Sequence, residues 1–186
     1  LGVTAPVESL DRLIRATRSQ LAHSTATLTI ENDRFEDGDL VFDVRVENLT
    51  GHKFPAGYPS RRAWLNIQVQ QARRPVFESG AFDPATGRLK GVTNELTLPH
   101  RDVVDGPDDV VVYEMTAADA QGQPTTSLLA MATRAKDTRL LPKGWRADGP
   151  YAEQTKPIGV DGDADFAAGG DVVHVRAPKL DASAGP

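Results

Sequence analysis

A histidine stands in the middle of a turn-rich segment, residues 48–70, with the sequence NLTGHKFPAGYPSRRAWLNIQVQ. Phe54 and Tyr58 each precede a proline, which biases their backbones toward extended geometry, and the two glycines of the loop allow backbone angles that other residues resist. A loop stiffened in this way can hold the imidazole of His52 as a ligand, or the imidazole can simply form hydrogen bonds inside the loop. The residues alone leave both hypotheses open.

Two more histidines and an arginine pair are further candidates for binding. His23 ends a predicted helix, where a cation favours the helix dipole, and it is a second candidate ligand if that helix packs on another domain. His100 could form a two-histidine copper or zinc site with His52 if the fold brings them together. Arg61 and Arg62 can pair with carboxylates of a ligand or serve as ordinary charges at a sheet edge.

An acidic run and the last histidine have mainly structural interpretations. Asp161, Asp163 and Asp165 alternate as in a calcium-binding loop, but the turn glycine and the closing glutamate of an EF-hand are missing. His174 lies opposite the valine face of a predicted strand and is expected on its solvent side. Because the sequence has neither a Gly-x-Ser-x-Gly motif nor a phosphate-binding loop, it predicts no catalytic centre.

Composition excludes several classes of function. A length of 186 residues predicts one domain. The net charge of −5 argues against a nucleic-acid partner, and no apolar run approaches the ~18 residues that span a bilayer, so no membrane span is predicted. The absence of cysteine excludes a disulfide framework, a thiolate zinc site and covalent haem attachment through Cys-x-x-Cys-His. Because the chain starts with neither methionine nor a secretory leader, we expect that an upstream segment has been removed.

Hydrophobic periodicity predicts one helix followed by strands. Residues 6–23 carry a helical apolar face, and after residue 24 the period changes to two, with a hairpin signal at Asp37-Gly38 and a single strand over residues 63–70. Residues 127–142 are ambiguous between helix and strand, and their proline-containing flanks favour extended structure for part of them. The helical face is formed by Leu10, Leu13, Ile14, Thr17 and Leu21.

These elements predict a mainly β chain, an antiparallel, Ig-like β-sandwich of about seven strands with one N-terminal amphipathic helix. The helix (residues 1–24) is expected to pack on the side of the β-sandwich domain (residues 25–186). The predicted core contains Leu28, Ile30, Phe42, Val44, Val46, Leu65, Ile67, Val69 and Val112.

Residues 48–65 resemble a motif of the C-terminal, haem-free β domain of multihaem cytochrome c family proteins, where Gly-His-Lys-Phe-Pro-x-Gly-x-Pro runs into a strand with a tryptophan. The segments DDVVVYEMTAADAQGQPTTSLL, AKDTRLLPKGW and GDADFAAGGDVVHV are similar to later blocks of that domain in the same order, so the resemblance covers roughly residues 28–176. It implies that the Cys-x-x-Cys-His motifs lie upstream and that the helix of residues 1–24 is the tail of an upstream, haem-binding region. Haem c would be bound by that upstream domain or by a partner domain, and this chain alone would be colourless.

The resemblance also implies a function and a compartment. The partner would be a multihaem cytochrome domain or a redox partner protein, and the shared activity would be electron transfer. The protein would be located in the periplasm or outside the cell. Since neutral imidazole is a good axial ligand for haem iron, His52 would be the ligand, with its second ring nitrogen held by Asn48, Thr50 or Asp43. Arg61 would pair with a haem propionate, as would Arg62.

A non-redox binding or adhesion sandwich of the cell envelope is the alternative. In that case Phe54, Tyr58 and Trp64 would contact a ligand or another protein. Haem-attachment motifs upstream of Leu1 would support the cytochrome hypothesis, and their absence would favour the alternative. The chain ends in small residues just after its last predicted strand, which is consistent with a fragment of a longer protein.

Overall fold

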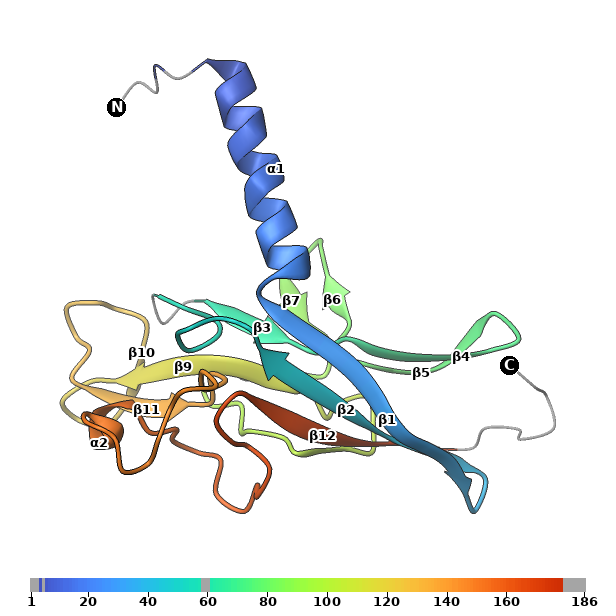
Figure 1. Cartoon of the computed structure of the whole chain (residues 1–186). Helices are drawn as coiled ribbons and strands as arrows, with labels where there is room; N and C mark the ends of the chain where they lie inside the picture. Colours follow the sequence, from blue (N-terminus) through green and yellow to red (C-terminus); the bar gives the residue numbers. More distant parts are fainter. Residues whose placement is uncertain (1–3, 5, 58–60, 179–186) are drawn as a thin grey trace.

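A computed structural model describes residues 4, 6–57 and 61–178, and these residues form a mainly β fold with one long N-terminal helix (Figure 1). Twelve strands are described, more than the sequence predicted, because several pairings of two or three residues add to seven longer strands. The elements are α1 (Val7–His23), β1 (Ala26–Glu36), β2 (Asp39–Asn48), β3 (Arg62–Trp64), β4 (Ile67–Gln71), β5 (Arg74–Ser79), β6 (Phe82–Asp83), β7 (Arg88–Leu89), β8 (Val103–Val104), β9 (Val112–Ala118), β10 (Pro124–Thr125), β11 (Thr133–Asp137), α2 (Ala152–Thr155) and β12 (Gly170–Ala177).

The first sheet has the strand order β1-β2-β12-β8. β1 and β2 form the hairpin predicted at Asp37-Gly38, where φ angles of 53° and 89° suit a tight type I′ turn. β12 runs antiparallel to β2, but β8 joins β12 in parallel, so the expectation of a wholly antiparallel fold is wrong at this edge. The long connection between β8 and β12 permits a parallel pair, which a short hairpin could not make.

The second sheet is built around β9, which pairs antiparallel with β3, β10 and β11. Two hairpins, β4–β5 and β6–β7, form separate two-stranded sheets. The single strand predicted over residues 63–70 is therefore divided, since β3 pairs with β9 and β4 pairs with β5. Residues 127–142 contain β11, which confirms extended structure for part of that segment.

One hydrophobic core joins the inner face of the first sheet to the chain around β9 and β4. Alternation along β2 predicted this face correctly, because every second side chain of a strand points to the same side. Six predicted core residues are buried, five of them in this core and Val112 in a smaller apolar cluster with Leu89 and Val110, and Val69 is half-buried against the main core. The six are Phe42, Val44, Val46, Leu65, Ile67 and Val112.

The burial predicted for Leu28 and Ile30 is wrong, since these side chains are 63% and 65% exposed. Both lie opposite core residues of β2, Leu28 facing Val46 and Ile30 facing Val44, so the alternation identified the correct face of β1. However, β1 is the edge strand of its sheet, and the second layer of the described chain does not cover it. A strand pattern determines the face of a side chain, but only the opposing layer buries it.

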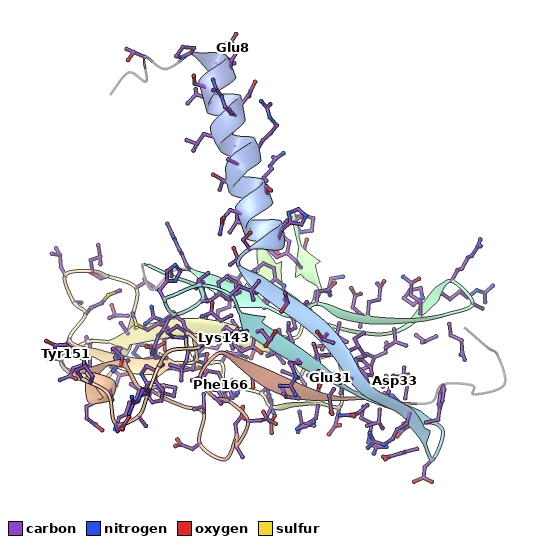
Figure 2. All side chains as sticks on the ribbon, viewed as in Figure 1. Glu8, Glu31, Asp33, Lys143, Tyr151 and Phe166 are labelled. Atoms are coloured by element: carbon purple, nitrogen blue, oxygen red, sulfur yellow. The ribbon has the colours of Figure 1, made fainter. Side chains whose placement is uncertain are left out.

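Helix α1 does not pack on the side of the β domain as predicted, because it projects away from the sheets (Figure 1). None of its residues is buried, and its side chains extend outward all around the helix (Figure 2). The predicted apolar residues do lie on a helix, but they are not covered by other described residues, and Leu13 and Leu21 are among the exposed ones. No helix in this part of the chain combines the length and apolar content that crossing a bilayer requires.

Candidate functional site

The loop that carries His52 is anchored at its start by a buried asparagine at the end of β2. The side-chain amide of Asn48 donates hydrogen bonds to the carbonyl oxygens of His52 (2.8 Å), Leu140 (3.2 Å) and Leu141 (3.2 Å). Its carbonyl oxygen accepts hydrogen bonds from the backbone and the hydroxyl of Thr50. Because Asn48 is completely buried, these bonds are shielded from water, and they hold the loop against residues 140 and 141.

The loop is anchored again directly after the histidine. The backbones of Phe54 and Leu140 exchange two hydrogen bonds, of 3.0 and 2.8 Å. The ammonium group of Lys53 lies 2.8 Å from a carboxylate oxygen of Asp137, which is fully buried at the end of β11. The residues on both sides of His52 are therefore tied to the body of the fold.

Asp137 is the centre of a charged network under the loop. Besides Lys53, it accepts hydrogen bonds from Arg134 at 2.9 Å and from two nitrogens of Arg139 at 2.8 Å each. Burial alone would raise the pKa of Asp137, but the hydrogen bonds from Arg139 and Lys53 outweigh burial and hold this pKa below its ordinary value. The carboxylate is therefore ionised at neutral pH and anchors three cations.

The imidazole of His52 is exposed, and one of its nitrogens is held in place. Nδ1 lies 2.9 Å from the carbonyl oxygen of Lys53 and 3.2 Å from the hydroxyl of Thr50. Since a carbonyl oxygen can only accept, Nδ1 carries the proton, and Nε2 of the neutral ring presents a lone pair. Of the three partners expected for this ring, Thr50 binds it, Asn48 binds the backbone carbonyl of His52 instead, and Asp43 pairs with His174.

The His52 loop forms one wall of an open cleft of about 620 Å³ beside the end of α1. Gln20 and Leu21 of the helix and Thr25 of the following turn line the other side. The loop side is lined by Thr50, His52, Phe54, Pro55, Ala56, Arg61, Arg62 and Ala63. An exposed imidazole, two arginines and the apolar end of α1 thus share one concave surface, which is called the His52 cleft below.

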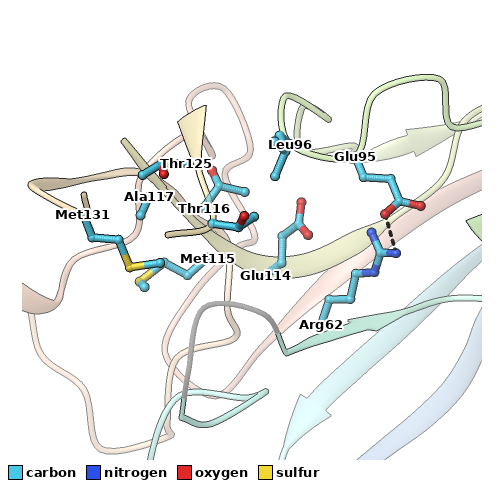
Figure 3. Close-up of a pocket in the computed structure, with 10 residues that line it drawn as sticks. Arg62, Glu95, Leu96, Glu114, Met115, Thr116, Ala117, Thr125 and Met131 are labelled. Atoms are coloured by element: carbon cyan, nitrogen blue, oxygen red, sulfur yellow. Dashed lines mark hydrogen bonds and ion pairs between the residues drawn. The ribbon is translucent and has the colours of Figure 1, made fainter. Parts of the chain in front are cut away.

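The two arginines of the His52 cleft have different environments. Arg61 is exposed, and its guanidinium makes one long hydrogen bond of 3.4 Å to the carbonyl of Ala56. Arg62 forms an ion pair of 2.8 Å with Glu95, which is the ordinary sheet-edge role considered for it (Figure 3). It also lines a second pocket of about 220 Å³, together with Glu114 (Figure 3). Arg61 is therefore the arginine available to a ligand.

The aromatic residues of the loop contribute to packing. Phe54 is half-buried against the main core, and Trp64 packs against a smaller cluster and lies 5.7 Å from the ring of Phe82. Tyr58, the third aromatic residue proposed to contact a ligand, lies outside the described residues.

The remaining histidines lie apart from the His52 imidazole. His23 is exposed in the last turn of α1, with Nδ1 3.0 Å from the carbonyl of Ser19, and it is not among the described lining of the His52 cleft. His100 is paired with Asp163, at 2.6 Å between Nε2 and Oδ2, rather than with His52. A two-histidine metal site is therefore not formed, because the contacts of each ring are made within different parts of the fold.

The acidic run also differs from a calcium loop. Asp163 and Asp165 point into two neighbouring groups of titratable side chains, one with His100 and Asp171 and the other with Asp102 and His174. Asp161 is exposed and belongs to neither group. Sequence analysis did not predict this arrangement, because residues 100–102 are about 60 residues away from residues 163–174 and only the fold brings the two regions together.

The chain has no match among protein-family models, among curated proteins or among solved structures.

Proposed function

We propose that this chain is an accessory β-module of an exported multihaem c-type cytochrome, which packs on a haem domain and supplies His52 as an axial ligand. One observation carries the proposal: Nδ1 of His52 is held by a backbone carbonyl, while the exposed ring leaves Nε2 without a hydrogen-bond partner among the described residues, at the edge of a cleft. Histidines that bind metals characteristically donate their other ring N–H in this way, because the bond sets the tautomer and the direction of the ring.

Helix α1 supplies the second line of support. Its apolar residues are exposed although the helix is amphipathic, and its last turn forms a wall of the His52 cleft. A surface helix normally buries such a face, so a partner domain that covers α1 would also cover the cleft. The stripe consists of Val7, Leu10, Leu13, Ile14 and Leu21.

Haem, when bound by the partner domain, would supply an iron centre that gains and loses one electron. This chain's residues would orient that centre: His52 by ligation through Nε2, and Arg61 by pairing its exposed guanidinium with a propionate. Two sheets that share one core support the Ig-like sandwich as part of this proposal, with a periplasmic or extracellular location.

A non-redox binding module of the cell envelope is the second candidate. The exposed face of α1 favours it to the same degree, because an apolar helix face can bind a protein without haem. Of the three aromatic residues on which this alternative was based, Phe54 lines the His52 cleft, whereas Trp64 packs against a smaller apolar cluster.

A haem peptide with one axial histidine and one open coordination position would test the ligand role directly. We expect the chain to convert the ferric peptide from high spin to low spin, as measured by its Soret band and by EPR, because Nε2 of His52 fills the open position. His52→Ala should abolish this conversion. His23→Ala, which removes another exposed imidazole, is the matched control and should behave as the wild type.

Equal conversion by wild type and His52→Ala would contradict ligation by His52. No conversion by any variant, together with binding of a haem-free partner to the α1 face, would support the envelope-binding candidate. Arg61→Ser should weaken peptide binding but leave the low-spin spectrum unchanged, since a propionate contact adds affinity without changing the axial ligand.

A further inference from the structure

Two regions that are far apart in the sequence, residues 100–102 and residues 163–174, bring histidine and aspartate side chains together. One potential ligand atom from each of His100, Asp163 and Asp171 lies within 4.8 Å of the others. These three residues are called the inner trio. A neighbouring outer trio, Asp102, Asp165 and His174, meets the same distance limit.

The inner trio is buried and partly oriented by its neighbours. The side chains of His100 and Asp163 are only 5% and 3% exposed, and Asp171 is 2% exposed. Tyr113 donates its hydroxyl hydrogen to Oδ2 of Asp171 at 2.7 Å, and the backbone N–H of Phe166 donates to Oδ1 of Asp163 at 2.9 Å. These bonds set the directions of both carboxylates, as outer residues do around metal ligands.

Two polar atoms of the inner trio have no partner in the part of the chain that the structure describes. They are Nδ1 of His100 and Oδ1 of Asp171. Buried polar atoms are nearly always hydrogen-bonded, because removing them from water without a partner costs about 1–3 kcal/mol each. Two such atoms in one cluster therefore point to a missing ligand.

The charges of the cluster point to a cation. Among the described residues, no lysine or arginine forms an ion pair with Asp102, Asp163, Asp165 or Asp171.

Both ring nitrogens of His174 in the outer trio face carboxylates. Nδ1 of His174 lies 2.7 Å from Asp43, and Nε2 lies 3.5 Å from Asp165. In the inner trio, Nε2 of His100 is paired with Asp163, but Nδ1 of His100 and Oδ1 of Asp171 have no partner among the described residues.

We propose that the inner trio binds one divalent transition-metal ion of the zinc, cobalt or manganese class. The ligands are one imidazole nitrogen of His100 and one carboxylate oxygen each from Asp163 and Asp171, and water would complete the coordination. A mixed nitrogen and oxygen set favours these metals, whereas calcium and magnesium prefer oxygen alone. A cleft of about 320 Å³ lies beside the inner trio and is lined by Asp165 and Asp171.

Cobalt is a suitable probe, because its visible absorption reports binding and coordination geometry. The full chain is treated with EDTA, freed of the chelator and titrated with Co²⁺ at pH 7.5. We expect saturation at one equivalent, visible d–d bands, displacement by Zn²⁺, and a higher melting temperature for the loaded protein.

Asp171→Asn preserves the shape of the side chain and should weaken Co²⁺ binding by at least about 100-fold, because loss of a ligand should cost no less than the roughly 10–100-fold caused by loss of a residue that only hydrogen-bonds a ligand. His100→Gln should weaken it similarly, and circular dichroism with urea titration would show that both variants are folded. Asp161→Asn, in the same loop but outside both trios, is the matched control and should bind as the wild type.

Absence of saturable Co²⁺ binding would overturn the proposal, as would equal affinity in Asp171→Asn. Displacement of Co²⁺ by Ca²⁺ at equal concentration would also overturn it, since that result indicates an oxygen-only site. The haem-peptide titration should be unaffected by Asp171→Asn, so failure at one site is distinguishable from failure at the other.

Discussion

Replacement of Asp137 by asparagine tests whether the charged network under the His52 loop stabilises the folded protein because it is buried. The substitution keeps the size of the side chain but leaves three cations facing a neutral amide, with lost contacts of 2.8 to 2.9 Å. Removing one partner of a buried ion pair typically destabilises a protein by about 3–5 kcal/mol, because the remaining charge is left uncompensated. We expect a loss in this range in urea denaturation at pH 7.

The effect of Asp137→Asn should depend on pH in a defined direction. The folded-state pKa of Asp137 lies below its ordinary value, so its contribution is fully present above the unfolded-state pKa of about 3.9. This contribution is lost as pH falls through the folded-state pKa and the carboxylate is protonated. The stability difference between wild type and Asp137→Asn should therefore shrink in acid.

The chain offers a matched control on its surface. Asp148 pairs with Arg146 at 2.8 Å, much like the distances around Asp137, but its side chain is 72% exposed. Since water screens an exposed pair, Asp148→Asn should leave the urea midpoint unchanged within error. Equal effects of the two substitutions would refute the argument that burial decides the strength of the network. Amide hydrogen exchange of residues 48–54 should increase only in Asp137→Asn.

Two further predictions concern the inner trio and α1. In metal-free protein, Asp171→Asn should become more stabilising as pH rises from about 4 to 6, by a total of about 3 kcal/mol. The reason is that the buried carboxylate of the wild type has a folded-state pKa of about 6, above its unfolded-state value of about 3.9, so the wild type loses stability over this range. Urea titrations with EDTA at several pH values measure the difference in stability between the two proteins, and a difference that does not change with pH would contradict the prediction. Leu13→Ser should change the free energy of unfolding by less than about 0.5 kcal/mol, because Leu13 is exposed on α1; a large loss in thermal denaturation would mean that the helix packs on the β domain after all.

Local sequence patterns determined much of the secondary structure. The hairpin at Asp37-Gly38 and the buried face of β2 follow from turn chemistry and a period of two, both of which depend on residues close together in the chain. The His52 loop was identified as a candidate site for the same reason, because its glycines, prolines and histidine are neighbours. Thr50 as a partner of the imidazole was also predictable from its position two residues away.

Tertiary structure alone decided which apolar faces are covered and which polar groups meet. Leu28 and Ile30 have the alternation of core residues, but within residues 6–57 and 61–178 no opposing layer covers their edge strand. His100 and Asp163 are 63 residues apart and show no motif, yet they lie 2.6 Å from each other in the fold. Periodicity reports the direction of a side chain relative to its own strand, whereas burial and charge compensation depend on what another segment brings against it.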